Sequence, residues 1–268
     1  MFKPTQLKVL FCLVTALLTL AFIAPLALGI ARVEPSKFLF TLKPGERTTG
    51  AIKVTNIQET ETEYTAVIHD WTLDDQDRLV TFPAGERADS LDGLIKFNPR
   101  RFKLAPGQSQ YVRFTLTTPV NGDWMERRGI IFFEENRPAK TEEAGSTVVI
   151  QVGTTVYLSF SETVHSFRTY GLKVETEENI EPTLLLALAN EGQAHIRYQV
   201  AYRITLADGT LFEENTSGER LILPASRRVV SLPFINRPPA GNYHLAVQIR
   251  FTGTKETLSA QVPFTIPD

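Results

Sequence analysis

The stretch Ile52-Lys-Val-Thr-Asn56 decides the fold class, because its side chains alternate along the chain. On an extended backbone Ile52, Val54 and Asn56 fall on one face, and Lys53 and Thr55 fall on the other. A Pro-Gly pair shortly upstream supplies a tight turn. An alternating run that follows a turn is typical of a half-buried β-strand.

The same pattern recurs along the chain, with turns about every ten residues. Between the turns lie short segments rich in Val, Ile, Thr, Phe and Tyr, which predict an all-β sandwich. The segment closest to a helix, Thr183–Ala189, is predicted as a strand, because it is short and a tight turn follows it. The turn pairs are Pro44-Gly45, Ala84-Gly85, Asp92-Gly93, Pro106-Gly107, Glu191-Gly192, Asp208-Gly209, Pro224-Ala225 and Ala240-Gly241.

The length of 268 residues fits a leader followed by two domains of about 100 residues each. A polar stretch from Ser161 to Gly171 precedes a fresh strand and marks the boundary. We therefore predict two tandem immunoglobulin-like β-sandwiches, over residues 32–162 and 170–268, after an N-terminal segment of residues 1–29.

Residues 1–29 have the pattern of a secretory signal peptide. Two lysines precede an apolar run from Val9 to Gly29, which ends in small residues. Cleavage would place the mature chain in the periplasm. The run is longer than most signal cores, so an uncleaved helix in the inner membrane is the alternative. The one cysteine, Cys12, lies in this segment, so the mature chain has no disulfide.

The chemistry of the chain indicates a binding protein rather than an enzyme. The formal net charge is −2 and no long basic run occurs, which gives no electrostatic case for nucleic acid or an anionic membrane. The four histidines are isolated, and no phosphate loop or nucleophile elbow is present. We predict no catalytic residue, no metal, no cofactor and no small-molecule substrate.

An acidic cluster, Asp74-Asp75-Gln76-Asp77, is the one stretch that suggests calcium. A loop of the EF type starting at Asp75 needs glycine at its sixth position, where Val80 stands. The cluster is therefore predicted as a hairpin loop between Trp71 and Leu79.

An ordered set of motifs also carries a family resemblance. It consists of Val33-Glu-Pro35, Pro44-Gly45, Ile52–Asn56, Trp71, Phe97-Asn-Pro99, Phe102–Gly107, Val112–Phe114 and Glu126–Phe132. Over residues 32–160 this set resembles the first domain of the PapD-like periplasmic chaperones of the chaperone–usher pathway, which assemble pili. The second half of the chain resembles that family only as an immunoglobulin-like sandwich.

The resemblance implies a way of binding a partner. In that family the last strand of the first domain lends alternating apolar side chains to an incomplete pilin subunit. The matching stretch here is Ser146–Phe160, and the resemblance implies Val148, Ile150 and Val152 as partner-binding residues. The same alternation also suits a strand whose apolar face lies in its own core, so both interpretations stay open.

The family further holds the terminal carboxylate of the subunit with a basic pair. Lys37 matches the arginine of that pair, and Tyr157 stands near the position of the lysine. The resemblance therefore implies partner-binding roles for both residues, with half of the basic pair replaced. This departure favours a divergent branch or another extended client.

The predicted function is that of a periplasmic chaperone-like protein that binds an exported, pilin-like subunit through an edge strand. The resemblance adds an outer-membrane usher as a second partner, and a bare edge strand predicts weak self-association. The alternative is a structural or adhesive envelope protein that uses its immunoglobulin-like domains as spacers. An uncleaved N-terminal helix would favour that alternative, because a tethered protein suits scaffolding.

Overall fold

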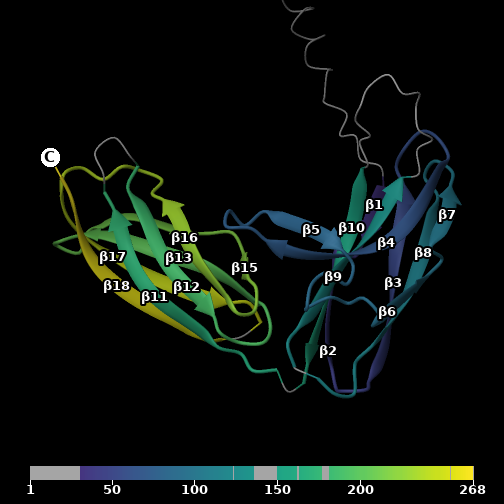
Figure 1. Ribbon diagram of the computed structural model, residues 1–268. Helices are drawn as coiled ribbons and strands as arrows, with labels where there is room; N and C mark the ends of the chain where they lie inside the picture. The colour runs from purple at the N-terminus through teal and green to yellow at the C-terminus, as the bar shows by residue number, and fades with distance from the viewer. Residues whose placement is uncertain are drawn as a thin grey trace, which may run out of the picture.

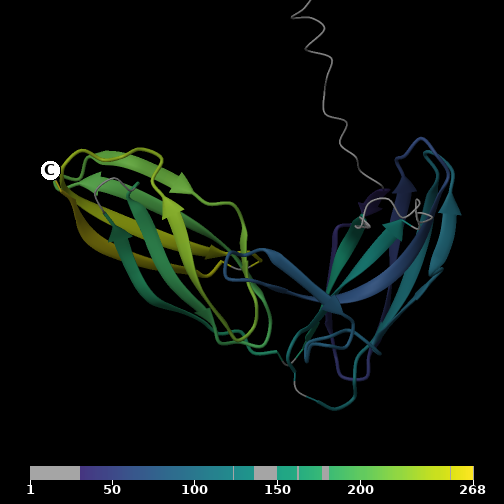
Figure 2. The same cartoon turned by 45° about the horizontal axis from the view of Figure 1, so that its top comes forward.

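The computed structural model describes residues 31–122, 124–135, 150–161, 163–176, 181–253 and 255–267. Every helix or strand assigned in these residues is a β-strand, which confirms the predicted all-β class. The strands form two lobes joined by a short connection (Figures 1 and 2). The predicted signal segment lies outside the described residues. Within them, no helix is long and apolar enough to cross a membrane.

The first lobe is a sandwich of two sheets. One sheet has the order β1 (Ala31–Glu34), β3 (Arg47–Asn56), β8 (Ser109–Thr117) and β6 (Ile95–Asn98). The other has the order β2 (Lys37–Leu42), β10 (Gln151–Phe160), β9 (Arg127–Glu135), β4 (Thr62–Leu73) and β5 (Leu79–Pro83), with β7 (Arg101–Leu104) paired to β4.

Alternating side chains from both sheets fill the core of the first lobe. Ile52 and Val54 are fully buried there, as the period of two in their strand predicts. They pack in one cluster with Phe114, Ile131 and Leu158, which are also buried. The core therefore uses one face of each sheet and leaves the other face for other contacts.

The first strand of the sandwich is divided between the two sheets. β1 pairs antiparallel with β3, the chain passes Pro35, and β2 then pairs parallel with β10. The parallel register joins Lys37–Leu42 to Thr155–Phe160. Proline has no N–H to donate to a ladder, so it suits the point where the chain changes sheets. This division determines which part of β10 has neighbours on both sides.

The second lobe is a smaller sandwich. Its three-stranded sheet has the order β11 (Phe167–Glu175), β12 (Thr183–Asn190) and β16 (Ser226–Pro233). Its other sheet has the order β14 (Leu211–Thr216), β13 (Ile196–Leu206), β17 (Gly241–Phe251) and β18 (Thr257–Ile266), with β15 (Arg220–Ile222) paired to β13.

The segment from Thr183 is a strand, as predicted, although its leucines favour helix. Leu184, Leu186 and Leu188 alternate into the second core and are fully buried. The pairing of β12 with β11 and β16 on its two sides overrides the intrinsic preference of the leucines.

Candidate functional site

The candidate site is the first part of β10, where the strand lacks one neighbour. β10 pairs with β9 from Gln151 to Leu158, but β2 begins to pair with it only at Thr155. Just before that point the hydroxyl of Thr154 donates to the carbonyl of Pro35 at 2.7 Å. Among the described residues, the stretch from Gln151 to Thr154 therefore has no ladder partner on its β2 side.

The apolar face of β10 changes character along the strand. Val156, Leu158 and Phe160 are completely buried in the first core. Ile150 and Val152 have the same parity but are only partly buried against that core. The third predicted donor residue, at position 148, lies outside the described residues. The later part of the strand thus belongs to its own core, while the earlier part keeps accessible apolar surface.

Gly153 lies in the stretch of β10 that has no partner on its β2 side, and glycine is needed there for a steric reason. A Cβ added there would stand 2.7 Å from a ring carbon of Phe132 and 2.8 Å from a methyl group of Ile130. Both neighbours belong to β9, which pairs with this part of β10. Any larger residue would displace them, so glycine allows β10 to lie tightly against β9.

Tyr157 lies on the outer face of the same sheet, where the second lobe covers it. Its side chain is 3% exposed, and its ring centroid is 5.8 Å from that of Trp71 and 4.4 Å from that of His195. Leu223 of the second lobe joins this cluster. Burial raises the pKa of the Tyr157 hydroxyl, although the charge of Arg197 opposes the shift. In this arrangement Tyr157 is part of the interface between the lobes.

Two cations, Lys37 and Arg197, act on the carboxylate of Glu219, and Arg197 also contacts Tyr157. Lys37 is exposed at the start of β2, and Arg197 comes from β13 of the second lobe. Arg197 donates to the carboxylate of Glu219 at 2.9 Å and to the Tyr157 hydroxyl at 3.5 Å. The pKa of Glu219 is lowered by the hydroxyl of Thr252, by Arg197 and, less strongly, by the charge of Lys37. Sequence reasoning missed Arg197, because only the folded chain brings the second lobe beside Tyr157.

A hollow of about 820 Å³ lies next to these cations. Leu39 of the first lobe lines it, and this side chain is 54% exposed. Phe167, Phe251 and Leu258 of the second lobe supply further apolar wall, and Arg197 stands in the lining. Glu256 also lines the hollow, so its wall offers apolar surface beside one cation and one acid.

The hairpin of β4 and β5 extends from the first lobe to the second (Figures 1 and 2). The acidic cluster forms the loop of this hairpin, as predicted. Arg228 donates to the carbonyl of Leu73 at 3.1 Å, and its Nε lies 3.2 Å from Oδ1 of Asp77. The described residues hold no group of three or more His, Cys, Asp or Glu side chains arranged for a metal ion. Asp75 and Asp77 pair with arginines of the second lobe, whereas Asp74 pairs with Arg78 of the same loop.

Neither a protein-family model nor a curated protein matches the chain. Solved structures do. The class 5 fimbriae chaperone CfaA is 13% identical with a TM-score of 0.48, and the match covers 87% of this chain and 100% of CfaA. The chaperone DraB of E. coli is 16% identical with a TM-score of 0.42, and the match covers 87% of this chain and 98% of DraB. At these identities and TM-scores the likeness assigns neither a family nor a partner to this chain.

A buried polar contact reinforces the junction of the two lobes. Glu126 is fully buried, and its Oε2 lies 2.5 Å from Nδ1 of His195 and accepts the hydroxyl of Ser159 at 3.1 Å. The backbone N–H of Glu126 donates to the carbonyl of Gln193 at 2.7 Å. Because a buried carboxylate is costly without donors, these contacts favour one arrangement of the lobes.

The substitution Leu223→Ala tests the coupling of the lobes. Leu223 is buried against Trp71, Ile130 and Tyr157, so its truncation is expected to remove about 2–3 kcal/mol of interface free energy. Both tryptophans, Trp71 and Trp124, lie in the first lobe, so their emission reports the unfolding of that lobe. Far-ultraviolet circular dichroism reports the unfolding of both lobes. The urea midpoint from tryptophan emission and the one from circular dichroism should differ by more in the variant than in the parent protein. The exposed Leu211→Ala is the control, and equal midpoints in all three proteins would contradict the interface.

Proposed function

We propose that this chain is a periplasmic chaperone-like protein that binds an exported, pilin-like subunit by pairing β10 with a strand of that subunit. The observation that carries the proposal is the unpaired edge from Gln151 to Thr154, beside the partly buried side chains of Ile150 and Val152. Export rests on the pattern of residues 1–29, and an outer-membrane usher remains a further proposed partner.

The backbone of the unpaired edge supplies the first part of the binding energy. Exposed N–H and C=O groups at a sheet edge accept an added strand, and alternate side chains give the pairing its specificity. The opposite edge of β10 is already paired to β9, and the strand continues into the buried residues Val156 and Leu158. The edge is thus held in an extended form before a client arrives, which lowers the entropy cost of binding.

Side-chain burial alone does not account for stable binding. Each aliphatic side chain that a client buries contributes about 1.5–3 kcal/mol, whereas association costs about 4–15 kcal/mol. Ile150 and Val152 therefore need support from backbone hydrogen bonds and from contacts in the hollow between the lobes.

The cations beside the hollow suit the terminal carboxylate of a client. Lys37 forms no hydrogen bond or ion pair with any described residue, so its ammonium is available. Arg197 already binds Glu219, and a client carboxylate would share its guanidinium. Charge-assisted bonds to a fixed carboxylate would set the register of the added strand along β10. Arg197 thereby takes the place of the basic residue that is absent at position 157.

The substitution Ile150→Arg tests the proposal. The parent chain is expressed in its native host with a photo-crosslinking amino acid at position 152, and the crosslinked exported protein is identified by mass spectrometry. Because residue 150 is only partly buried, the arginine can extend into water and the lobe should fold. Crosslinking should fall by about tenfold or more, equivalent to about 1.4 kcal/mol.

Val229→Arg is the matched control, because Val229 is an exposed aliphatic residue on β16 of the second lobe. This variant should capture the client as the parent chain does. The proposal is wrong if Ile150→Arg folds and still captures the client at the parental level. It is also wrong if the crosslinked segment of the client is not an extended strand.

A further inference from the structure

The outer face of the sheet β1-β3-β8-β6 carries an excess of positive charge. Alternate residues of these strands point away from the core, and all but one of the charged residues among them are basic. The whole chain has a formal net charge of −2, whereas the outward positions of this sheet hold five basic residues and one acid. The basic residues are Arg32, Arg47, Lys53, Lys96 and Arg113, and the acid is Glu34.

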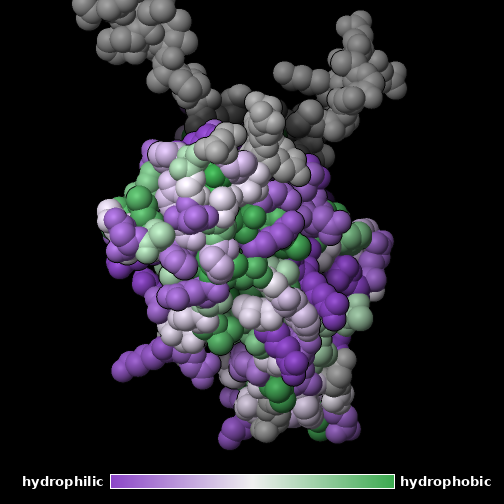
Figure 3. All heavy atoms as spheres, turned by 90° about the vertical axis from the view of Figure 1, so that its left-hand side faces the viewer, coloured by the Kyte–Doolittle hydropathy of each residue, from purple (hydrophilic) through white to green (hydrophobic). Residues whose placement is uncertain are grey.

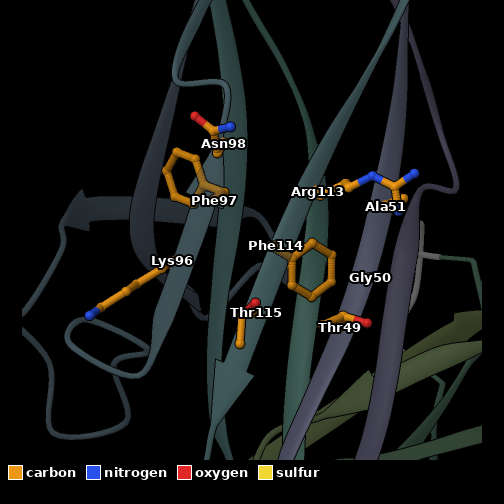
Figure 4. A pocket seen from close by; sticks show the side chains of 9 residues that line it. All are labelled: Thr49, Gly50, Ala51, Lys96, Phe97, Asn98, Arg113, Phe114 and Thr115. Atoms are coloured by element: carbon orange, nitrogen blue, oxygen red, sulfur yellow. The ribbon is translucent and has the colours of Figure 1, made fainter.

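Small residues between these cations leave a hollow of about 500 Å³ (Figure 4). Arg113 on β8 lies in register with Ala51 on β3 and with Asn98 on β6. In the next row Lys96 lies in register with Thr115. The hollow is therefore surrounded by cationic and hydrogen-bonding side chains, and small residues such as Gly50 and Ala51 line it.

Most of this charge is not neutralised within the protein. Arg32 pairs with Glu34 at 3.4 Å, but the side chains of Lys53, Lys96 and Arg113 form no hydrogen bond or ion pair with any described residue. On the outer face of the sheet β14-β13-β17-β18 in the second lobe, by contrast, an arginine is paired with an acid. There Arg203 pairs with Glu214 at 3.0 Å. Figure 3 shows hydrophilic and hydrophobic residues interspersed over the side of the molecule that it presents.

Tyr111 lies on the outer face of β8, two residues before Arg113. It is 56% exposed and lies in register with Lys53. Exposed tyrosine and arginine are the residue types that most often contribute binding energy at protein interfaces. The outward positions of these four strands hold no large aliphatic side chain that could insert into lipid. These features favour a folded protein over a membrane as the occupant.

We propose that this basic face docks a second protein through an acidic surface patch whose carboxylates contact Lys96 and Arg113. The face belongs to the sheet that does not contain β10, so the edge of β10 stays open when the basic face is occupied. The inference does not depend on the strand-pairing function.

The proposal is tested by titrating the purified protein with hexaglutamate and following backbone amide shifts by NMR, with hexaglutamine as the uncharged control peptide. Hexaglutamate is expected to shift amides of β3, β6 and β8 in a saturable way, and added salt should weaken the binding. The double substitution Lys96→Glu and Arg113→Glu should weaken it by about tenfold or more. Both side chains are exposed, so the variant should keep the parental melting temperature.

Lys103→Glu is the matched control, because Lys103 is an exposed lysine on β7 of the other sheet. It should bind hexaglutamate as the parent protein does. The proposal is overturned if the peptide does not saturate, or if Lys103→Glu weakens binding as much as the double substitution. Binding to vesicles of phosphatidylglycerol without binding to the peptide would also overturn it and assign the face to a membrane.

Discussion

Leu158→Asp is expected to leave the first lobe unfolded. The side chain of Leu158 is 0% exposed in the middle of the first core. An aspartate there would bury a charge without a partner, at a cost above about 4–5 kcal/mol. That cost is comparable with the whole stability of a domain, which is about 5–15 kcal/mol. Trp71 and Trp124 both lie in the first lobe, so their emission in a urea titration measures this loss.

The matched variant is Ile150→Asp, at the residue that directly precedes β10 and packs on the same side of the sheet. Ile150 is only partly buried, so this lobe should still unfold cooperatively with a midpoint close to that of the parent. A cooperative transition in Leu158→Asp would contradict the division of β10 into a fully buried part and a partly accessible part. Equal damage from both substitutions would place Ile150 in the core and remove the basis for strand donation.

Glu213→Ala is expected to destabilise the second lobe by about 3–5 kcal/mol. The Glu213 carboxylate is 6% exposed and accepts the Tyr202 hydroxyl at 2.6 Å. It also accepts the backbone N–H groups of Ile235 and Asn236, at 3.0 Å and 2.8 Å. Alanine would leave these donors without an acceptor, and an unsatisfied buried group costs its full desolvation energy. Far-ultraviolet circular dichroism in urea measures the change.

Glu213 also gives the second lobe a defined pH dependence. Burial acts to raise the pKa of this carboxyl, but the hydrogen bonds from Tyr202, Ile235 and Asn236 outweigh it and hold the pKa below its ordinary value. A carboxyl whose folded pKa is depressed contributes stability above its unfolded pKa of about 4.3, and the contribution is lost as the pH falls through the folded pKa.

The difference in unfolding free energy between the parent and Glu213→Gln should therefore be complete near neutral pH. It should shrink as the medium becomes more acidic than about pH 4. Glutamine keeps the shape and one acceptor oxygen of the side chain, so this comparison isolates the charge. A difference that stays constant across this acidic range would contradict the assigned role of the carboxylate.

Local patterns in the sequence are enough to predict the strands and the all-β class of the fold. Alternation at Ile52 and Val54, and again at Leu184 and Leu186, describes a local property of an extended chain. The Pro-Gly turns are equally local, and Gly45 has a φ of 75°, which favours glycine. Each of these signals spans a few residues, so no knowledge of distant contacts is needed to interpret them.

Which part of β10 stays accessible depends on contacts made in the folded chain. Ile150 and Leu158 follow the same alternation in the sequence, because a strand looks alike whether its apolar face meets its own core or another protein. They differ because the chain changes sheets at Pro35, so β2 reaches β10 only from Thr155 onward. The role of Tyr157 is likewise set by the second lobe, which covers it with Leu223 and brings Arg197 to its hydroxyl. These contacts join residues far apart in the chain, and the periodicity of a single segment carries no information about them.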